Sequence, residues 1–213
     1  MFLEMERLSP KERYKLLTAL VVPRPIALVT TVSPEGVLNA APFSFFNVLA
    51  QDPPLLVLGI GERAPGMPKD TARNIARSGE FVVHLVDEPL AEAMNLCAVD
   101  FPAEVSELDH ASVRLEPSRL VAPARIQEAP AAFECRRHVD LPLGRAGLLV
   151  IGRVLCVHLR DGLIDGERLR VDYERYRPVG RLCGDLYCRI HERFAMRRRS
   201  YREWLAERET EGR

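Results

Sequence analysis

Three groups of side chains in this chain could bind a ligand through aromatic, hydroxyl and cationic groups. Residues 43–47 read Phe-Ser-Phe-Phe-Asn, which gathers rings and small polar groups in a stretch too broken to be a good helix or strand. Thr30 and Thr31 end a run of branched residues with two hydroxyls. Lys69 adds a cation just before an expected helix, where free N–H groups and the helix dipole favour a phosphate.

A flat, phosphorylated ring system such as FMN needs all three groups. Its ring takes apolar contacts and hydrogen bonds along one edge, its ribityl chain takes hydroxyls, and its phosphate takes a helix end or a cation. Residues 43–47, Thr30 and Thr31, and the segment Lys69-Asp70-Thr71 can supply these in turn. Two plainer interpretations stay open, because rings at this spacing also pack in cores and a lysine beside a helix cap is also an ordinary solvated residue.

Other sequence motifs are weaker. Residues 59–64, Gly-Ile-Gly-Glu-Arg-Ala, fit the spacing of a dinucleotide fingerprint, but Pro65 and Pro68 break the helix that such a motif must open. Neither a nucleophile elbow nor a metalloprotease motif occurs, so no catalytic side chain is predicted. His84 alternates with valines in a strand-like run, which is typical of a core histidine with satisfied hydrogen bonds.

Two cysteine–histidine spacings resemble metal ligands. They are Cys135-x-x-His138 and a second group formed by Cys183, Cys188 and His191. A structural zinc ion needs four ligands, and residues three apart in a strand point to opposite faces. We therefore predict no metal site at either spacing.

Composition limits the class of protein. A chain of 213 residues can bury a substantial core in one large domain. Thirty basic and thirty acidic residues give no net charge to attract nucleic acid, and no apolar run approaches the length needed to cross a membrane. Five scattered cysteines do not form a disulfide framework, and the charged N-terminus is unlike a signal peptide. We expect a reducing cytoplasm.

The local patterns predict a mainly β protein with inserted helices. A serine cap with Pro10 begins a short helix. Strands are expected at residues 24–32 and 37–44, joined by a type I turn at 33–36, and at residues 54–61, which read as a central strand. A helix capped by Asp70 or Thr71 and ended by Gly79 precedes a strand at 81–86. Further strands are expected at residues 113–115, 131–139 and 148–158.

Hairpins with helices between them favour a closed or partly open barrel over a doubly wound sheet. Residues 1–193 are expected to form this domain, and residues 194–213 a charged helical extension.

Three segments resemble a known family in sequence and in order. They are RPIALVTTVSPEGVLNAAPFSFFNVLAQDPPLLVLGI, KDTARNIARSGEFVVHLV and YRPVGRLCGDLY. Together they are similar to the flavin reductase-like, FMN-binding split-barrel family, which includes NAD(P)H:flavin oxidoreductases and flavoredoxins. The resemblance covers residues 23–189. It implies a six-stranded Greek-key split barrel that forms a homodimer, with FMN near the dimer interface.

The resemblance also implies which residues bind the cofactor. The matching positions are Thr30, Thr31, Asn39, Ser44, Phe45, Phe46, Asn47, Lys69, Asp70, Thr71, Arg181 and Tyr187. Lys69 and the Thr71 hydroxyl are expected to hold the phosphate. Two positions depart from the family pattern, since Cys183 stands where glycine is usual and His84 where asparagine is common.

The expected function is that of an NAD(P)H-dependent oxidoreductase. FMN would accept a hydride from NAD(P)H, and the electrons would pass to free flavin or to an acceptor protein. One alternative is a non-enzymatic FMN electron carrier. Another is a split-barrel module for a different ligand such as haem, for which His84 or His191 would be the axial candidates. No nucleic-acid or membrane partner is expected.

Overall fold

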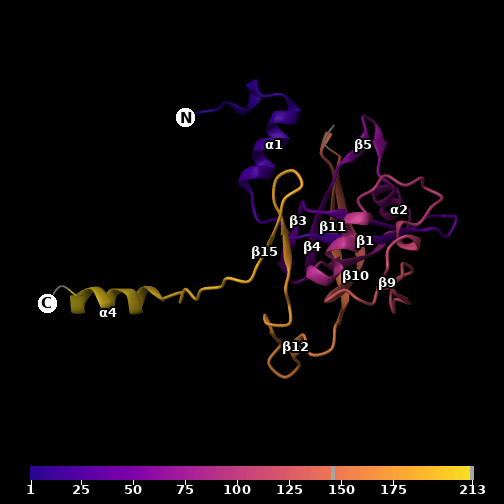
Figure 1. The fold of residues 1–213 in the computed structure, drawn as a ribbon. Coiled ribbons are helices and arrows are strands. Elements are labelled where there is room, and N and C mark those ends of the chain that lie inside the picture. The colour runs from indigo at the N-terminus through magenta and orange to yellow at the C-terminus, as the bar shows by residue number, and fades with distance from the viewer. Residues whose placement is uncertain (145–146, 212–213) are drawn as a thin grey trace.

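The computed structural model describes residues 1–144 and 147–211. Its centre is an antiparallel sheet of seven strands in the order β2-β1-β7-β10-β11-β4-β3 (Figure 1). These strands are β1 (Ala27–Val32), β2 (Leu38–Phe43), β3 (Phe46–Gln51), β4 (Pro54–Ile60), β7 (Glu80–Leu85), β10 (Ala131–Pro142) and β11 (Leu148–Leu159). Eight short strands within the described residues pair outside this sheet: β5 (Glu62–Ala64), β6 (Met67–Pro68), β8 (Leu115–Glu116), β9 (Arg125–Ile126), β12 (Ile164–Asp165), β13 (Arg170–Val171), β14 (Val179–Arg181) and β15 (Tyr187–Arg189).

The sheet curves around one buried cluster. Side chains from all seven strands and from one helix, α2, belong to it, including Phe43 and Phe46 from the two edge strands. Side chains from both edge strands therefore contact the same core. Their hydrophobic surfaces are removed from water together, although the two strands lie at opposite edges of the sheet. The expected mainly β architecture with inserted helices is confirmed. The sheet has seven strands, however, where the resemblance implies six.

Short helices begin and end at the signals in the sequence. Ser9 and Glu12 form the capping box of α1 (Pro10–Leu20). Gly79, in the left-handed conformation with φ of 72°, ends α2 (Asp70–Ser78) as expected. The other helices are α3 (Ala91–Leu96), α4 (Tyr201–Glu211) and the 3-10 turns η1 (Met5–Arg7), η2 (Glu88–Leu90) and η3 (Glu107–Asp109).

Three local expectations were wrong. Lys69 is the N-cap of α2, so Asp70 and Thr71 lie inside the helix and do not cap it. The stretch that reads as too broken for a strand contains β3, an edge strand with a register shift between Val48 and Ala50. Edge strands tolerate such irregularity because only one side must pair. β4 is therefore next to an edge, and β10 is the central strand.

The outer face of the sheet carries a second buried cluster. Leu28 and Ala40 from the sheet pack there against Leu90 and Met94 and against Val179 of β14. The segment that follows β15 leads away from the sheet and carries α4 at its end (Figure 1). None of the described helices combines the length and the apolar character needed to cross a bilayer.

Candidate functional site

A cavity of about 500 Å³, which we call the main groove, opens where α1, α3, the end of β2 and the β14–β15 hairpin meet. Its lining combines apolar and polar side chains: Tyr14, Ile26, Pro42, Phe43, Ser44, Met94, Asn95, Ala98, Arg181, Asp185 and Tyr187. A smaller cavity of about 90 Å³ shares Pro42 and Ala98 with it and reaches the N-terminus of α2. We call this the helix-end cavity. The two cavities adjoin at these shared residues, and we call the helix-end cavity the charged end of the site because Arg63, Lys69 and Asp70 line it.

Arg24 holds together the elements around the main groove. Its side chain is buried, and its guanidinium donates to the Ser44 hydroxyl at 3.2 Å and to the Leu182 carbonyl at 2.8 Å. It also donates to the Thr18 carbonyl near the end of α1. A buried guanidinium must satisfy its donors, so these bonds fix α1, the β2–β3 connection and the hairpin relative to one another.

The far wall of the main groove is a cation–aromatic pair. The Arg181 guanidinium lies 4.4 Å from the centre of the Tyr187 ring. The Tyr187 hydroxyl lies 3.5 Å from Asn95 Oδ1 on α3. This wall therefore offers a flat ring, a positive charge and polar groups to a ligand in the groove.

The helix-end cavity is lined by the first residues of α2. Within the described part of the chain, no side-chain hydrogen bond caps this helix, so the positive end of its dipole at the cavity is left without a side-chain acceptor. The Lys69 ammonium lies 5.7 Å from the Phe43 ring centre. Asp70 is paired with Arg63 at 3.2 Å and with Arg73, which keeps two further cations beside the helix end.

Five polar side chains form a network beneath this cavity. Thr31 lies opposite Asn39 in the β1–β2 register, and Asn39 Oδ1 accepts from the Thr71 hydroxyl at 3.0 Å. Asn74 donates to the Thr31 hydroxyl at 3.0 Å. Asn39 also donates through Nδ2 to Glu107 Oε1 at 2.8 Å, while Glu107 Oε2 accepts from the Ala40 N–H at 2.8 Å. The network joins the sheet, α2 and η3 at the charged end of the site.

Glu107 is a buried carboxyl within this network. Burial raises its pKa, and the nearby Asp70 charge acts in the same direction, while the bonds from Ala40 and Asn39 only partly oppose them. Cys97, which lines the same cavity, is buried as well, and burial raises its pKa to about 12. Its thiol is therefore protonated and unreactive at neutral pH.

The structure gathers most of the sequence-predicted residues at this site. Ser44, Arg181 and Tyr187 line the main groove, while Asn39, Lys69, Asp70 and Thr71 line the helix-end cavity. Thr31 joins them through the hydrogen-bond network.

Four predicted residues do not line either cavity. Thr30 faces the other side of β1 and donates to the Ala124 carbonyl at 2.8 Å. Phe46 belongs to the buried core. Phe45 is 50% exposed and lies 6.2 Å from the Tyr14 ring, and Asn47 is exposed with its side chain bonded to the next backbone N–H. Thr30 points away from the network that Thr31 joins because successive residues of a strand point to opposite faces of the sheet.

Several residues of the site were not predicted from the sequence. Tyr14, Met94 and Asn95 reach the main groove from helices, and Glu107 reaches the network from a 3-10 turn. Nothing near them in the sequence resembles a binding motif. Arg63 of β5 was also not predicted, although a cation shortly before Lys69 is a signal for an anion site.

His84 fulfils its expectation as a core residue. It is fully buried, its Nδ1 lies 2.9 Å from the Leu28 carbonyl, and its Nε2 accepts from the Ile126 N–H at 2.9 Å. Burial lowers its pKa to about 4, so it is neutral at pH 7. Cys135 is buried while His138 is exposed, in agreement with the expectation that they face apart.

Comparison with known proteins now identifies the family. Residues 19–180 match the family described as "Flavin reductase like domain". The chain belongs to this flavin reductase-like family.

Solved structures agree with this assignment. Nitrilotriacetate monooxygenase component B from Bacillus cereus is 36% identical with a TM-score of 0.88, over 92% of this chain and 98% of that chain. The 2-nitrobenzoate 2-nitroreductase NbaA of Pseudomonas fluorescens is 38% identical with a TM-score of 0.85, over 94% and 98%. A split barrel domain protein from Shewanella frigidimarina NCIMB 400 is 18% identical with a TM-score of 0.79, over 93% and 100%, and this likeness concerns the fold alone.

Proposed function

We propose that this flavin reductase-like protein binds FMN, takes a hydride from NAD(P)H onto the flavin, and passes the electrons to free flavin or to a partner protein. The observation that carries this proposal is that the main groove and the helix-end cavity adjoin at Pro42 and Ala98. A ligand with a flat ring at one end and a phosphate at the other matches such a site.

The residues present fit FMN at both ends. The main groove offers Pro42, Phe43 and Met94 to a ring, with Ser44 and Asn95 as hydrogen-bonding partners. At the other end the N–H groups of the first turn of α2 and the Lys69 ammonium would hold the phosphate.

In this proposal the Thr71 hydroxyl orients Asn39, whereas the sequence led us to expect that it holds the phosphate. It donates to Asn39 Oδ1, so its proton is already engaged. Asp70 is a carboxylate and offers no donor, and it instead keeps Arg63 and Arg73 close to the phosphate end.

Bound FMN would supply the hydride-accepting ring, and the chain would supply binding and orientation. Arg24 keeps Ser44 in place beside the ring, and Glu107 keeps Asn39 oriented beneath the helix end. Phe43 and the Arg181–Tyr187 pair would exclude water from the ring. No side chain is required to act as an acid or base.

A small aromatic compound is a second candidate for the final electron acceptor. The observation in its favour is the 38% identity to NbaA, whose name gives 2-nitrobenzoate as its substrate. The name of the Bacillus cereus protein, a monooxygenase component, instead supports an acceptor protein. Oxidation of NADH in the presence of 2-nitrobenzoate, compared with free FMN, would distinguish the two acceptors.

The same proposal includes a homodimer in the cytoplasm with a Greek-key split barrel in each copy. Large apolar side chains are exposed on α1 and around β3, where a second copy would cover them: Leu17, Leu20, Phe45, Val48 and Leu49.

Haem is less well supported than flavin. Both ring nitrogens of His84 are engaged, His191 is paired with Glu88 at 2.9 Å, and neither histidine lines the main groove.

The decisive experiment is the visible absorption spectrum of the purified protein, followed by titration of the colourless form with FMN and by anaerobic addition of NADH. Binding of FMN with bleaching on NADH supports the full proposal. Binding without bleaching supports the electron carrier instead. No binding in the titration would contradict the assignment of the groove.

A further inference from the structure

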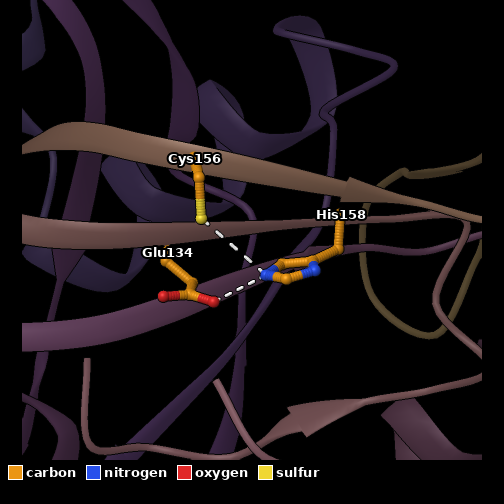
Figure 2. Close-up of side chains that lie close together, drawn as sticks. All are labelled: Glu134, Cys156 and His158. Atoms are coloured by element: carbon orange, nitrogen blue, oxygen red, sulfur yellow. Dashed lines mark hydrogen bonds and ion pairs between the residues drawn. The ribbon is translucent and has the colours of Figure 1, made fainter. Parts of the chain in front are cut away.

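Three potential metal ligands converge on the central strands (Figure 2). Glu134 on β10 lies opposite Cys156 on β11 in the strand register, and His158 follows Cys156 by two residues on the same face. His158 Nε2 lies 2.6 Å from Glu134 Oε1 and 3.8 Å from Cys156 Sγ. All three ligand atoms lie within 4.8 Å of one another.

None of the three residues lines the main groove or the helix-end cavity. The cluster is therefore separate from the proposed flavin site. Sequence spacing does not reveal it, because Glu134 is 22 residues before Cys156 and only the hairpin register brings them together.

The spacing of the ligand atoms is close to that of a tetrahedral zinc site. Zinc–sulfur bonds of about 2.3 Å and zinc–nitrogen or zinc–oxygen bonds of about 2.0 Å place neighbouring ligand atoms roughly 3.3–3.5 Å apart. The Glu134–His158 separation of 2.6 Å would open by less than about 1 Å to reach these bond lengths. The Cys156–His158 separation of 3.8 Å would close by a few tenths of an ångström, also on these bond lengths.

The surroundings orient the carboxylate as a metal ligand requires. Glu134 is fully buried, and backbone N–H groups of Arg119 and Leu120 donate to its two oxygens at 2.7 and 2.6 Å. Such outer bonds fix a ligand before the ion arrives. The His158 side chain is 15% exposed, so the cluster is not sealed from solvent.

We propose that Glu134, Cys156 and His158 bind a thiophilic divalent cation, with zinc as the first choice and water as the fourth ligand. On binding, the Cys156 thiol releases its proton to solvent and forms a sulfur–metal bond. The imidazole proton moves to Nδ1 as Nε2 binds the ion. One thiolate and one carboxylate then balance the two charges of the cation, which makes its partial burial tolerable.

Cobalt(II) is the probe for this site, because a thiolate ligand gives it a charge-transfer absorption band in the near ultraviolet. The full chain, treated with a chelator and reduced, is titrated with Co²⁺ in the absorption spectrometer and with Zn²⁺ in the calorimeter. We expect one ion per chain and a charge-transfer band. Loss of an outer-shell partner alone weakens metal binding by about 10- to 100-fold, so Cys156→Ser should weaken it by at least about 100-fold and abolish the band.

Two variants keep the test specific. Cys188→Ser removes a partly buried thiol elsewhere and should keep the band. His158→Gln can still donate to Glu134, so it should remain folded while its Zn²⁺ affinity falls. Absence of a band in the unmodified chain, or a band that survives Cys156→Ser or is lost with Cys188→Ser, would overturn the proposal. In that event the cluster has only a structural role, in which Glu134 accepts hydrogen bonds from the backbone N–H groups of residues 119 and 120.

Discussion

Glu107 and Glu134 are both buried carboxyl groups that accept hydrogen bonds from backbone N–H groups, yet their pKa values shift in opposite directions. Burial raises the pKa of Glu107, and neither the Ala40 N–H nor the Asn39 amide overcomes it. Burial also raises the pKa of Glu134, but the N–H groups of Arg119 and Leu120 and the His158 imidazole outweigh this and hold it below its usual range. Both carboxyl groups are buried and hydrogen-bonded, and they differ in the neighbouring charge: Asp70 raises the pKa of Glu107, whereas His158 lowers that of Glu134.

The opposite pKa shifts agree with the different surroundings of the two residues. Glu107 lies beside the proposed flavin site and shares its neighbourhood with the Asp70 carboxylate, which disfavours a second negative charge. Glu134 faces donors only, and no cavity of the flavin site reaches it. The surroundings of Glu107 thus favour the protonated carboxyl more than an ordinary site does, whereas those of Glu134 favour the carboxylate.

His84 tests the same idea with the largest expected effect, because burial and the nearby Arg125 charge both disfavour its protonation, and only the bond to the Leu28 carbonyl opposes them. Its pKa is lowered to about 4, while the unfolded value is near 6.5, so the unfolded chain binds more protons between these values. Stability is therefore complete above pH 6.5 and falls as the pH drops toward 4, by about 3 kcal/mol at the most. Urea denaturation at several pH values measures this loss. His84→Asn, which cannot titrate, should lack it, and an equal loss in both proteins would refute the assignment.

Amide substitutions should separate the two carboxyl groups directly. In Glu134→Gln one end of the amide must face a fixed backbone N–H, at a cost of about 2 kcal/mol in the free energy of unfolding. In Glu107→Gln the Asn39 amide can turn over to accept from the new NH₂ group, and the Thr71 hydroxyl can rotate to accept from the turned amide, so the cost should stay below about 1 kcal/mol. Urea denaturation at pH 7 compares the two variants. Equal costs would contradict the distinction.

Flavin binding should depend on the charged end of the groove and not on the Glu134 cluster. Lys69→Ala removes one phosphate-binding cation and should weaken FMN binding by about tenfold, because one charge-assisted hydrogen bond is lost. Arg77→Ala, at the other end of α2, is the matched control and should leave the affinity unchanged. Glu134→Gln should also leave it unchanged. Fluorescence titration with FMN measures all three, and unchanged affinity in Lys69→Ala would remove Lys69 from the site.

The smallest expected effect is a difference between the two glutamine variants in how the free energy of unfolding depends on pH. A lowered pKa means that Glu134 stabilises the fold above its ordinary pKa, and that this contribution is lost as the pH falls through the folded value. A raised pKa means the reverse for Glu107, whose contribution is lost as the pH rises toward the folded value. Glu134→Gln should thus reduce the loss of stability in acid, while Glu107→Gln should gain relative to the unmodified chain as the pH rises. Denaturation curves between about pH 3 and pH 8 span the ordinary carboxyl range.

Part of this protein could be predicted from short stretches of its sequence. The capping box at Ser9, the turn that begins at Ser33 and the glycine that ends α2 all appear in the structure, because each depends on hydrogen bonds within four residues. The three segments that resemble the flavin reductase-like family also sufficed for the family and the β architecture.

Tertiary structure decided the rest. β3 was missed because its pairing with β4 overrides a poor local pattern, and only the sheet decides that Thr30 donates to the Ala124 carbonyl while Thr31 joins the network. Glu107 reaches Asn39 across 68 residues of chain, and the β10–β11 register, shifted beside Glu134, brings that residue to Cys156 and His158. Local sequence sets backbone preferences over a few residues, whereas the partners of a buried polar group depend on how distant elements pack.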